Sequence, residues 1–277
     1  MTFILQLAVD GTIEKPVLNI PPVDTHKYRR GHAVVFSGPQ MRTGASRLAA
    51  QAALHVGAGV VTLVGDENSL REHASHVTAI MLRELDVELS CLDDRVMAVA
   101  IGPGAGDGEE LRERIIAVLD FSIPVVLDAD ALTCFEGSPA RLFSHLHAKC
   151  ILTPHMGEFA RVFQGIDLED KGTAALEAAR RSGAVVLLKG PETCVATPSG
   201  QLAVNRHSAA WLATAGSGDV LTGLICGLMA QGHGAYEAAC MASWLHGDIG
   251  VTGGPGLTAD TMIGQIPLVL RNCLVED

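Results

Sequence analysis

Short apolar segments alternate along this chain with stretches of small residues at helical spacing, and this alternation restricts the fold more than any other feature. The apolar segments, which we interpret as strands, are 33–36, 60–64, 97–101, 125–127, 150–152 and 185–188. The helical stretches between them are 44–57, 108–119, 156–163 and 172–182. Strands that are apolar on both faces are typical of parallel sheets covered by helices. We therefore predict an α/β fold with a mostly parallel central sheet and helices on both faces.

The last third of the chain has a different pattern. Residues 193–198 and 202–205 are separated by a Ser-Gly pair and predict a β-hairpin. Two long helices are expected at about 218–232 and 235–250. The first has almost no charge, so it should be buried on all sides.

Residues 1–26 contain three prolines and no sustained periodicity, and we interpret them as an N-terminal arm. No repeat, low-complexity tract or change of composition follows. Residues 27–277 are therefore predicted to form a single domain.

The composition argues against several classes of protein. Aromatic residues make up 4% of the chain, so the core must consist mainly of Ala, Val, Leu and Ile. The net charge of −11 argues against a nucleic-acid partner, because an acidic surface repels phosphate backbones. No apolar stretch has the length or flanks of a signal peptide or a membrane span. The seven cysteines are scattered without a CxxC pair, which favours buried free thiols and a cytoplasmic location.

A glycine-rich helix start at 213–221 is the strongest candidate for binding phosphate. The chain has no GxxxxGK[ST] motif, and its GPGAG stretch does not fit GxGxxG. Gly216 and Gly218 would let a ligand approach the backbone, and the first-turn amides would favour an anion. Asp219 should be ionised there and could accept a proton from a substrate hydroxyl. An ordinary helix start capped by Ser217 or Asp219 fits the same residues.

Four further loops rich in Gly, Asp, His or Lys come directly after predicted strands, at 102–106, 128–132, 153–158 and 189–193. Because the carboxyl ends of parallel strands meet at one edge of a sheet, these loops should form one ligand site. Asp128 and Asp130 could bind Mg²⁺ or position water there. Asp130 would equally fit as the cap of the helix that follows.

In this order, the segments resemble those of the ribokinase-like superfamily, and within it the ADP/ATP-dependent NAD(P)H-hydrate dehydratases. The resemblance runs from residue 26 to about residue 270. It rests on KYRRGH at 27–32, GPGAG at 102–106, DADAL at 128–132, TPHMGE at 153–158, LKG at 188–190 and GSGDVLTG at 216–223. Each motif is weak alone, whereas the ordered set is specific.

The resemblance implies a hydro-lyase that repairs hydrated NADH or NADPH, called NADHX and NADPHX. ADP or ATP would phosphorylate the hydroxyl that water addition placed on C6 of the nicotinamide ring. Phosphate would then leave as the double bond returns, with Mg²⁺ neutralising phosphate charge during the transfer. The family also suggests a homotetramer. Because the epimerase domain often fused to it is absent, a separate NAD(P)HX epimerase could act alongside this chain.

The family's site residues match positions of this chain, and Asp219 corresponds to the catalytic base. The substrate-binding positions are Ala45, Gly106, His155 and Asp219. The nucleotide-binding positions are Lys189, Gly190, Pro191, Glu192, Thr193 and Gly218. No residue is assigned to a metal, since His155 and Glu158 lack a third ligand for zinc. Plainer interpretations are helix packing for Ala45, a turn for Gly106, a helix cap for His155 and a solvated charge for Lys189.

One departure from the family precedes the GSGD loop. Many members carry Gly-Asn-Pro-Gly-Met, whereas residues 208–212 read SAAWL, so Trp211 could cover the nicotinamide or the adenine. Two other functions fit the sequence. A small-molecule kinase of the same superfamily, acting on a vitamin-precursor alcohol, would share the fold and Asp219. A non-catalytic nucleotide-binding protein would share only the fold and the glycine-rich loop.

Overall fold

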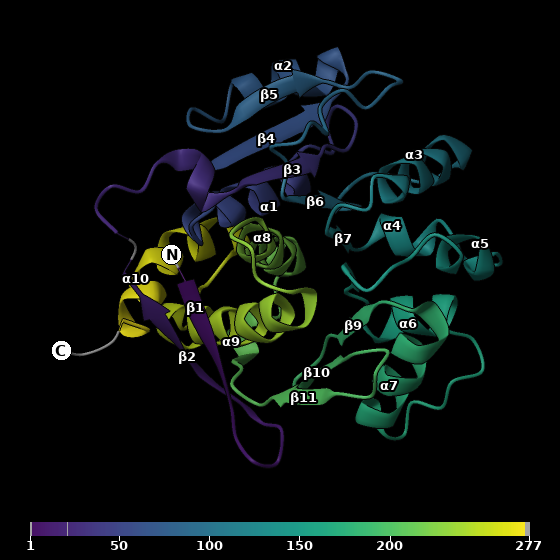
Figure 1. Cartoon of the computed structure of the whole chain (residues 1–277), viewed down its shortest axis with the longest axis vertical. Helices are drawn as coiled ribbons and strands as arrows, with labels where there is room; N and C mark the ends of the chain where they lie inside the picture. The colour runs from purple at the N-terminus through teal and green to yellow at the C-terminus, as the bar shows by residue number, and fades with distance from the viewer. Residues whose placement is uncertain (1, 21, 275–277) are drawn as a thin grey trace.

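The computed structural model describes residues 2–20 and 22–274, and its centre is a nine-stranded sheet (Figure 1). The strand order is β11-β10-β9-β8-β7-β6-β3-β4-β5. Strands from β9 to β5 pair in parallel, and β10 is antiparallel to both of its neighbours. The bounds are β3 (His32–Phe36), β4 (Val60–Gly65), β5 (Met81–Glu84), β6 (Ala98–Ile101), β7 (Val125–Leu127), β8 (Cys150–Leu152), β9 (Val185–Leu188), β10 (Thr193–Ala196) and β11 (Leu202–Asn205). The predicted mostly parallel sheet is confirmed.

Helices cover both faces of the sheet because successive side chains of each buried strand point to opposite sides. In β3, Ala33 and Val35 belong to one apolar core, and Val34 and Phe36 belong to the other. The first core is shared with α1 (Gly44–His55), α8 (Ser217–Ala230), α9 (Ala235–Gly253) and α10 (Ala259–Asn272). The second is shared with α3 (Glu109–Asp120), α4 (Asp130–Thr133), α5 (Pro139–Phe143), α6 (Met156–Val162) and α7 (Lys171–Ser182). A further helix, α2 (Glu67–Ala74), packs against β4 and β5.

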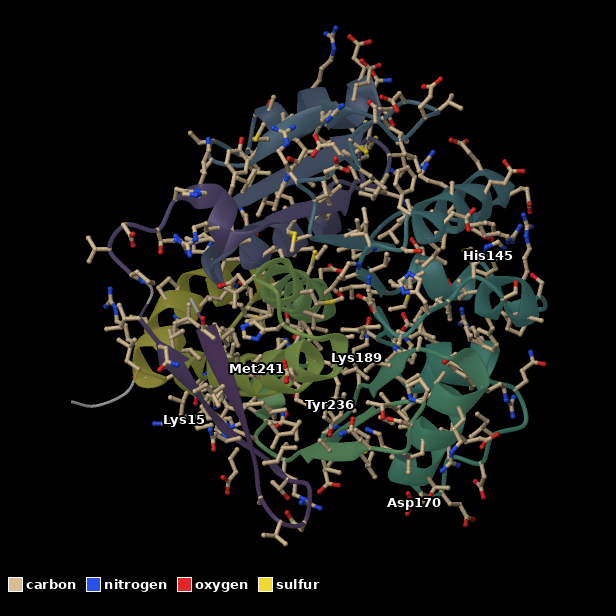
Figure 2. The ribbon with its side chains drawn as sticks, in the orientation of Figure 1. Lys15, His145, Asp170, Lys189, Tyr236 and Met241 are labelled. Atoms are coloured by element: carbon tan, nitrogen blue, oxygen red, sulfur yellow. The ribbon has the colours of Figure 1, made fainter. Side chains whose placement is uncertain are left out.

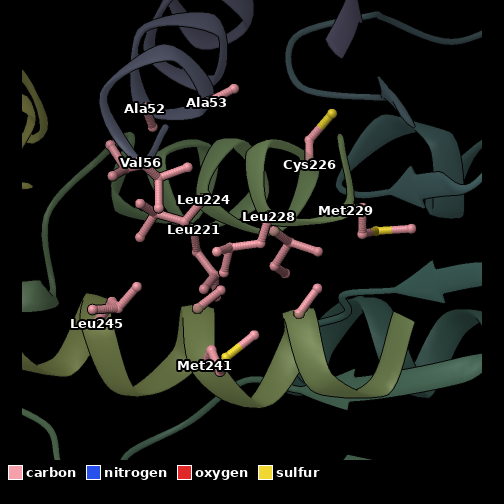
Figure 3. Packing of buried hydrophobic residues seen from close by; sticks show 14 of the residues in the cluster. Ala52, Ala53, Val56, Leu221, Leu224, Cys226, Leu228, Met229, Met241 and Leu245 are labelled. Carbon is pink, nitrogen blue, oxygen red and sulfur yellow. The ribbon is translucent and has the colours of Figure 1, made fainter. Parts of the chain in front are cut away.

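Helix α8 is buried on nearly all sides, as its lack of charge predicts. Figure 3 shows it between α1 and α9, with leucines of α8 directed toward Met241 and Leu245 of α9. On the α1 side, α8 presents glycines. A Cβ on Gly223 would lie 2.1 Å from the carbonyl oxygen of Ala49, so the two helix backbones are in close contact there. This packing fixes where the N-terminus of α8 lies relative to the sheet.

The N-terminal residues form regular structure that their sequence pattern does not predict. Strands β1 (Thr2–Leu7) and β2 (Ile13–Asn19) make an antiparallel hairpin that packs against α9 (Figure 1). Phe3, Ile13 and Leu18 of the hairpin are buried in the first core. The periodicity is obscured because the pairing shifts register between Ile4 and Gln6 and because β2 contains a proline. The division into an arm and a domain stays a prediction.

Other differences from the sequence-based prediction are small. Strand β6 begins at Ala98, one residue later than predicted, and α8 begins at Ser217. The edge strand β5 and helices α2, α5 and α10 were not predicted. All seven cysteines are free and buried, which confirms the prediction of unpaired thiols. Within the part of the chain that the structure describes, no helix is long and apolar enough to cross a membrane.

Candidate active site

The loops that follow β6, β7, β8 and β9 meet at the carboxyl edge of the sheet, beside the N-terminus of α8. Their meeting point is Asp128, whose side chain is almost fully buried. Its Oδ1 accepts hydrogen bonds from Thr153 Oγ1 at 2.8 Å and from Lys189 Nζ at 2.8 Å, and its Oδ2 accepts one from Thr222 Oγ1 at 2.7 Å. Because two of these donors directly follow β8 and β9 and the third is in α8, Asp128 connects the sheet edge to the helix.

Asp130 does not cap α4, so that interpretation is wrong. It is the first residue of α4, and its Oδ2 accepts a hydrogen bond from the backbone N–H of Gly106 at 2.8 Å. The preceding Ala129 has φ 48° and ψ −116°, a strained conformation for a residue with a Cβ. The loop after β6 lies close to this turn, since a Cβ on Gly102 would lie 1.8 Å from the Asp128 carbonyl oxygen. Strain and close approach at one place are typical of functional sites.

Lys189 is a partly buried ammonium and not a solvated charge, so that plainer interpretation is also wrong. It lies near the centre of the molecule (Figure 2), 2.8 Å from Asp128 Oδ1 and 3.7 Å from Glu158 Oε2. Burial by itself lowers the pKa of Lys189, but the charges of Asp128 and Glu158 outweigh burial and hold the pKa above its ordinary value. The Lys189 ammonium lies beside the first turn of α8, since a Cβ on Gly218 would lie 3.5 Å from its Nζ. Its raised pKa keeps it protonated there.

Asp219 lies in the first turn of α8, and its environment differs from the one that the sequence predicts. Burial, followed by the charge of Asp128, raises the pKa of Asp219 to about 7, and only Lys189 among the principal neighbours opposes this. The expectation that Asp219 is ionised at neutral pH therefore holds only in part, since a group with this pKa is also substantially protonated at pH 7. The helix N-terminus favours a carboxylate, but desolvation and nearby acidic groups outweigh it. A carboxyl group with a pKa near neutrality is suited to general-base catalysis.

A cavity of about 890 Å³ opens beside Lys189 and the first turn of α8. Of the residues predicted to bind ligands, six line it: His155, Lys189, Gly190, Pro191, Thr193 and Gly218. The opposite wall is formed by the segment that follows β11 and by α9. Glu192 belongs to the same loop as Lys189 but is not in the wall. The cavity is of the size of a typical small-molecule site.

Three predicted substrate positions, Ala45, Gly106 and Asp219, are not in the wall of this cavity, and Ala45 and Gly106 lie close to each other. A Cβ on Gly104 would lie 3.3 Å from the Cβ of Ala45, and a Cβ on Gly106 would lie 3.6 Å from Arg42 Nη1. Ala45 is in the first turn of α1, and Gly106 has φ 88°, a backbone conformation that favours glycine. The structure thus places two groups of predicted residues at the sheet edge: one in the cavity and one beside α1.

His155 caps α6, which confirms the plainer interpretation of this residue, and it also lines the cavity. Its Nδ1 accepts hydrogen bonds from the N–H groups of Gly157 at 2.9 Å and Glu158 at 3.3 Å. Glu158 Oε2 accepts in turn from the backbone N–H of His155 at 2.8 Å, which completes a capping box. Because Nδ1 accepts, a neutral His155 carries its proton on Nε2.

Several polar residues of the site were not identified from the sequence. Thr153 and Thr222 bind Asp128, and Thr222 lies one helical turn after Asp219, a spacing that would have pointed to it. His246 of α9 lines the cavity with its Nε2 2.9 Å from Ser217 Oγ, and burial lowers the pKa of His246 to about 4. No local sequence signal distinguishes it within an apolar helix. Trp211 is 46% exposed and is not part of the cavity wall, although its neighbours Ala210 and Leu212 are, and its contact with a ligand stays a prediction.

The chain has a ribokinase-like fold. The chain superimposes with a TM-score of 0.81 on a ribokinase-like superfamily protein from Enterococcus faecalis, which is 22% identical and for which 93% of each chain is covered. More narrowly, the chain belongs to the NAD(P)H-hydrate dehydratase family, whose model matches residues 33–260.

Two relatives support this assignment. The ADP-dependent (S)-NAD(P)H-hydrate dehydratase of Neisseria meningitidis is 36% identical, with 90% of this chain and 86% of that protein covered. The ADP/ATP-dependent NAD(P)H-hydrate dehydratase of Bacillus subtilis, co-crystallised with ATP and Mg²⁺, has a TM-score of 0.80 at 28% identity, covering 93% of this chain and 95% of that one. The chain also spans about half the length of the bifunctional NAD(P)H-hydrate repair enzymes that it matches, such as that of Synechocystis.

Proposed function

We propose that this chain catalyses the ADP- or ATP-dependent dehydration of NADHX and NADPHX to NADH and NADPH. The observation that carries the proposal is the position of Asp219. Its carboxyl group, with a pKa near 7, lies in the first turn of α8, close enough for its pKa to respond to the charges of Lys189, which lines the cavity, and of Asp130, which holds Gly106. A base in that position could act on a hydroxyl presented from one side while phosphate is delivered from the other.

The cavity has the features of a nucleotide site. Gly218 opens the first turn of α8, where free amides and the helix dipole favour phosphate oxygens, and Lys189 contributes a cation beside them. We assign Lys189, Gly190, Pro191, Glu192, Thr193 and Gly218 to nucleotide binding. Among the described residues, no cluster of three His, Cys, Asp or Glu could hold a metal ion. Mg²⁺ would be bound by phosphate oxygens of the nucleotide, where it offsets the charge of the transferred group.

We assign Ala45, Gly106 and His155 to the hydrated dinucleotide, and Asp219 to its C6 hydroxyl. The dinucleotide is extended, and these positions span the sheet edge from α1 to α6. Gly106 would allow the ligand to lie against the loop, because it has no side chain. His155, protonated at Nε2 in its neutral form, would offer one hydrogen-bond donor to the substrate.

The chemistry explains why a nucleotide is needed. Asp219 would accept the proton of the C6 hydroxyl as its oxygen attacks the terminal phosphorus, whose bond to the departing nucleotide breaks. The lone pair on the ring nitrogen next to C6 can then expel phosphate, which is a much better leaving group than hydroxide. Loss of a proton from C5 restores the C5–C6 double bond. ATP would thus yield ADP, inorganic phosphate and NADPH from NADPHX.

The test measures how much inorganic phosphate is released for each NADPH restored. Incubation of NADPHX with ATP or ADP and Mg²⁺ should release inorganic phosphate in a one-to-one ratio with restored NADPH absorbance, and no phosphate ester should accumulate. Steady formation of a stable ester from a pyrimidine or thiazole alcohol, with no recovery of NADPH absorbance, would instead establish the kinase alternative. Binding of nucleotide without turnover of any of these substrates would support the non-catalytic alternative.

Three further properties belong to this proposal. The protein would act in the cytoplasm, where reduced dinucleotides are used and where its free thiols would stay reduced. It would assemble as a homotetramer. It would work alongside a separate NAD(P)HX epimerase, a pairing that agrees with the bifunctional names of its longer relatives.

A further inference from the structure

The turn of the N-terminal hairpin extends to the far edge of the central sheet. Thr12 forms a parallel bridge with Val204 of the edge strand β11, and the N–H of Val204 donates to the carbonyl oxygen of Gly11 at 3.0 Å. Gly11 has φ 81°, and a Cβ there would lie 3.0 Å from the Leu202 carbonyl oxygen. Backbone contacts therefore hold the turn against β11. The turn lies at the end of the hairpin opposite the N-terminus (Figure 1).

Arg206, the residue after β11, connects this turn to the loop that we assign to the nucleotide. Its Nη1 donates to Thr12 Oγ1 and lies 3.7 Å from Asp10 Oδ2. Its Nε donates to Glu192 Oε1 at 3.2 Å. Arg206 also lines the cavity. One guanidinium therefore contacts the hairpin turn, the nucleotide loop and the cavity at the same time.

The same loop is held from its other side by Lys171, at the start of α7. Lys171 Nζ donates to the carbonyl oxygen of Lys189 at 3.3 Å and to that of Glu192. A Cβ on Gly190 would lie 2.4 Å from Lys171 Nζ, so the loop and this ammonium are in close contact. Glu192 is thus fixed through its carbonyl group by Lys171 and through its carboxylate by Arg206.

We propose that the turn of the N-terminal hairpin is a positioning element of the nucleotide site. Asp10 and Thr12 hold Arg206 against Glu192, and this contact fixes the loop 189–193 in the conformation that receives the nucleotide. The proposal rests on the proposed function, since it assumes that this loop binds ADP or ATP. It assigns a role to a segment that lies outside the residues matched by the family model.

The size of the effect follows from the exposure of the contacts. The side chains of Arg206, Asp10 and Glu192 are 51%, 67% and 60% exposed, and exposed ion pairs each contribute little. Loss of the turn's hold on Arg206 should therefore weaken nucleotide binding about two- to fivefold. Because Arg206 is remote from Asp219 in its contacts, the rate of the chemical step should not change.

The experiment compares Thr12→Val with Thr12→Ser. Valine keeps the branched shape that suits the bridge to Val204 but removes the hydroxyl that accepts from Arg206, whereas serine keeps the hydroxyl. Thr12→Val should raise the Kd for ADP in calorimetry and the KM for nucleotide about two- to fivefold. Its kcat, its KM for NADPHX and its melting temperature should match those of the wild type, and Thr12→Ser should behave as wild type in all measurements.

A second background shows whether the effect passes through Arg206. In Arg206→Met, adding Thr12→Val should produce no further change in the Kd for ADP. A wild-type Kd for Thr12→Val, an equal rise in both KM values, or an additive effect in Arg206→Met would each overturn the proposal. Failure of the wild-type chain to bind ADP or ATP at all would refute the proposed function instead, and the two results are therefore distinguishable.

Discussion

At the scale of single residues, Asp219 is unusual in being close to three other acidic groups, those of Asp128, Asp130 and Glu158. Lys189 compensates for only part of this negative charge, because Asp128 already holds it at 2.8 Å. The site thus contains a carboxyl group that releases its proton near neutral pH. Proton affinity of this kind is useful to a base that must take a proton from an alcohol and later release it.

The pH profile should reveal this carboxyl group. Only the ionised form of Asp219 can accept a proton, so kcat/KM for NADPHX should fall as the pH drops through about 7, the pKa of that residue. We expect a loss of about tenfold for each pH unit well below this value, measured from about pH 5.5 to about pH 8.5 with nucleotide held saturating. A profile that stays flat down to about pH 5.5 would show that Asp219 is ionised throughout, or that it is not the base.

Asp219→Asn should separate catalysis from binding and stability. Turnover should fall by about 10²–10⁴-fold, while the Kd for ADP stays near that of the wild type.

The raised pKa of Asp219 means that the folded state binds this proton more tightly than the unfolded state does. Wild-type stability should therefore decline as the pH rises from about 4 through about 7, and the asparagine variant should escape this decline.

Urea unfolding at two pH values tests the second half of that prediction. At about pH 8, Asp219→Asn should have a free energy of unfolding about 1–3 kcal/mol above that of the wild type. At about pH 3 the two proteins should be nearly equal, because the carboxyl group is then mostly protonated in both states. A variant that is less stable than the wild type at both pH values would contradict the burial argument.

At the scale of secondary-structure elements, the contact between α1 and α8 decides where the first turn of α8 lies. Gly223→Ala should lower the free energy of unfolding by about 1–3 kcal/mol, since its Cβ would lie 2.1 Å from the Ala49 carbonyl oxygen. Gly264→Ala in α10 is the matched control, because a Cβ there meets no atom within 4 Å. The control should gain about 0.5–1 kcal/mol from helix propensity. Equal effects of the two substitutions would disprove the close helix contact.

The first turn of α8 also supports a prediction about binding. Gly218→Val should raise the Kd for ADP more than about tenfold, because a branched side chain would fill the space between the helix amides and Lys189. The fold should tolerate the change, since Gly218 does not have a positive φ and sits at an accessible helix start. Calorimetry with ADP and Mg²⁺ measures the change. Unchanged affinity in a folded variant would place the phosphate groups elsewhere.

At the scale of the whole molecule, the centre of the fold was predictable and its margins were not. Strands β7, β8 and β9 have the predicted bounds, because they are buried on both faces and consist of continuous apolar residues. The edge strand β5 includes Arg83 and Glu84 and is largely exposed, so it carries no such signal. Helix α10 contains Pro267, which argues against a helix in sequence although the neighbouring elements accommodate it.

The candidate site was also predictable only in part. The loops after the strands were predictable because topology alone brings them to one edge of the sheet. The hydrogen bonds from Thr222 and Lys189 to Asp128 join residues far apart in sequence. The burial that shifts the pKa of Asp219 also depends on tertiary packing, which a local sequence pattern does not reveal. The local helix dipole favours an ionised Asp219, but burial and neighbours distant in sequence outweigh it and raise the pKa of this residue.

Ligand-induced stabilisation of the whole chain tests whether the two groups of site residues act together. Mg²⁺ and ATP at about 100 times the Kd should add about 2.7 kcal/mol to the free energy of unfolding, which corresponds to a rise of roughly 5 °C or more in melting temperature. Gly218→Val should show a clearly smaller rise at the same concentrations, because its Kd is higher. If the dinucleotide binds beside Ala45 and Gly106, NADP⁺ should add a further rise on top of saturating ATP. A thiazole or pyrimidine alcohol that adds this second rise where NADP⁺ does not would favour the kinase alternative. Displacement of ATP by NADP⁺ would mean that both ligands occupy the cavity beside Lys189 and that the assignment of Ala45 and Gly106 is wrong.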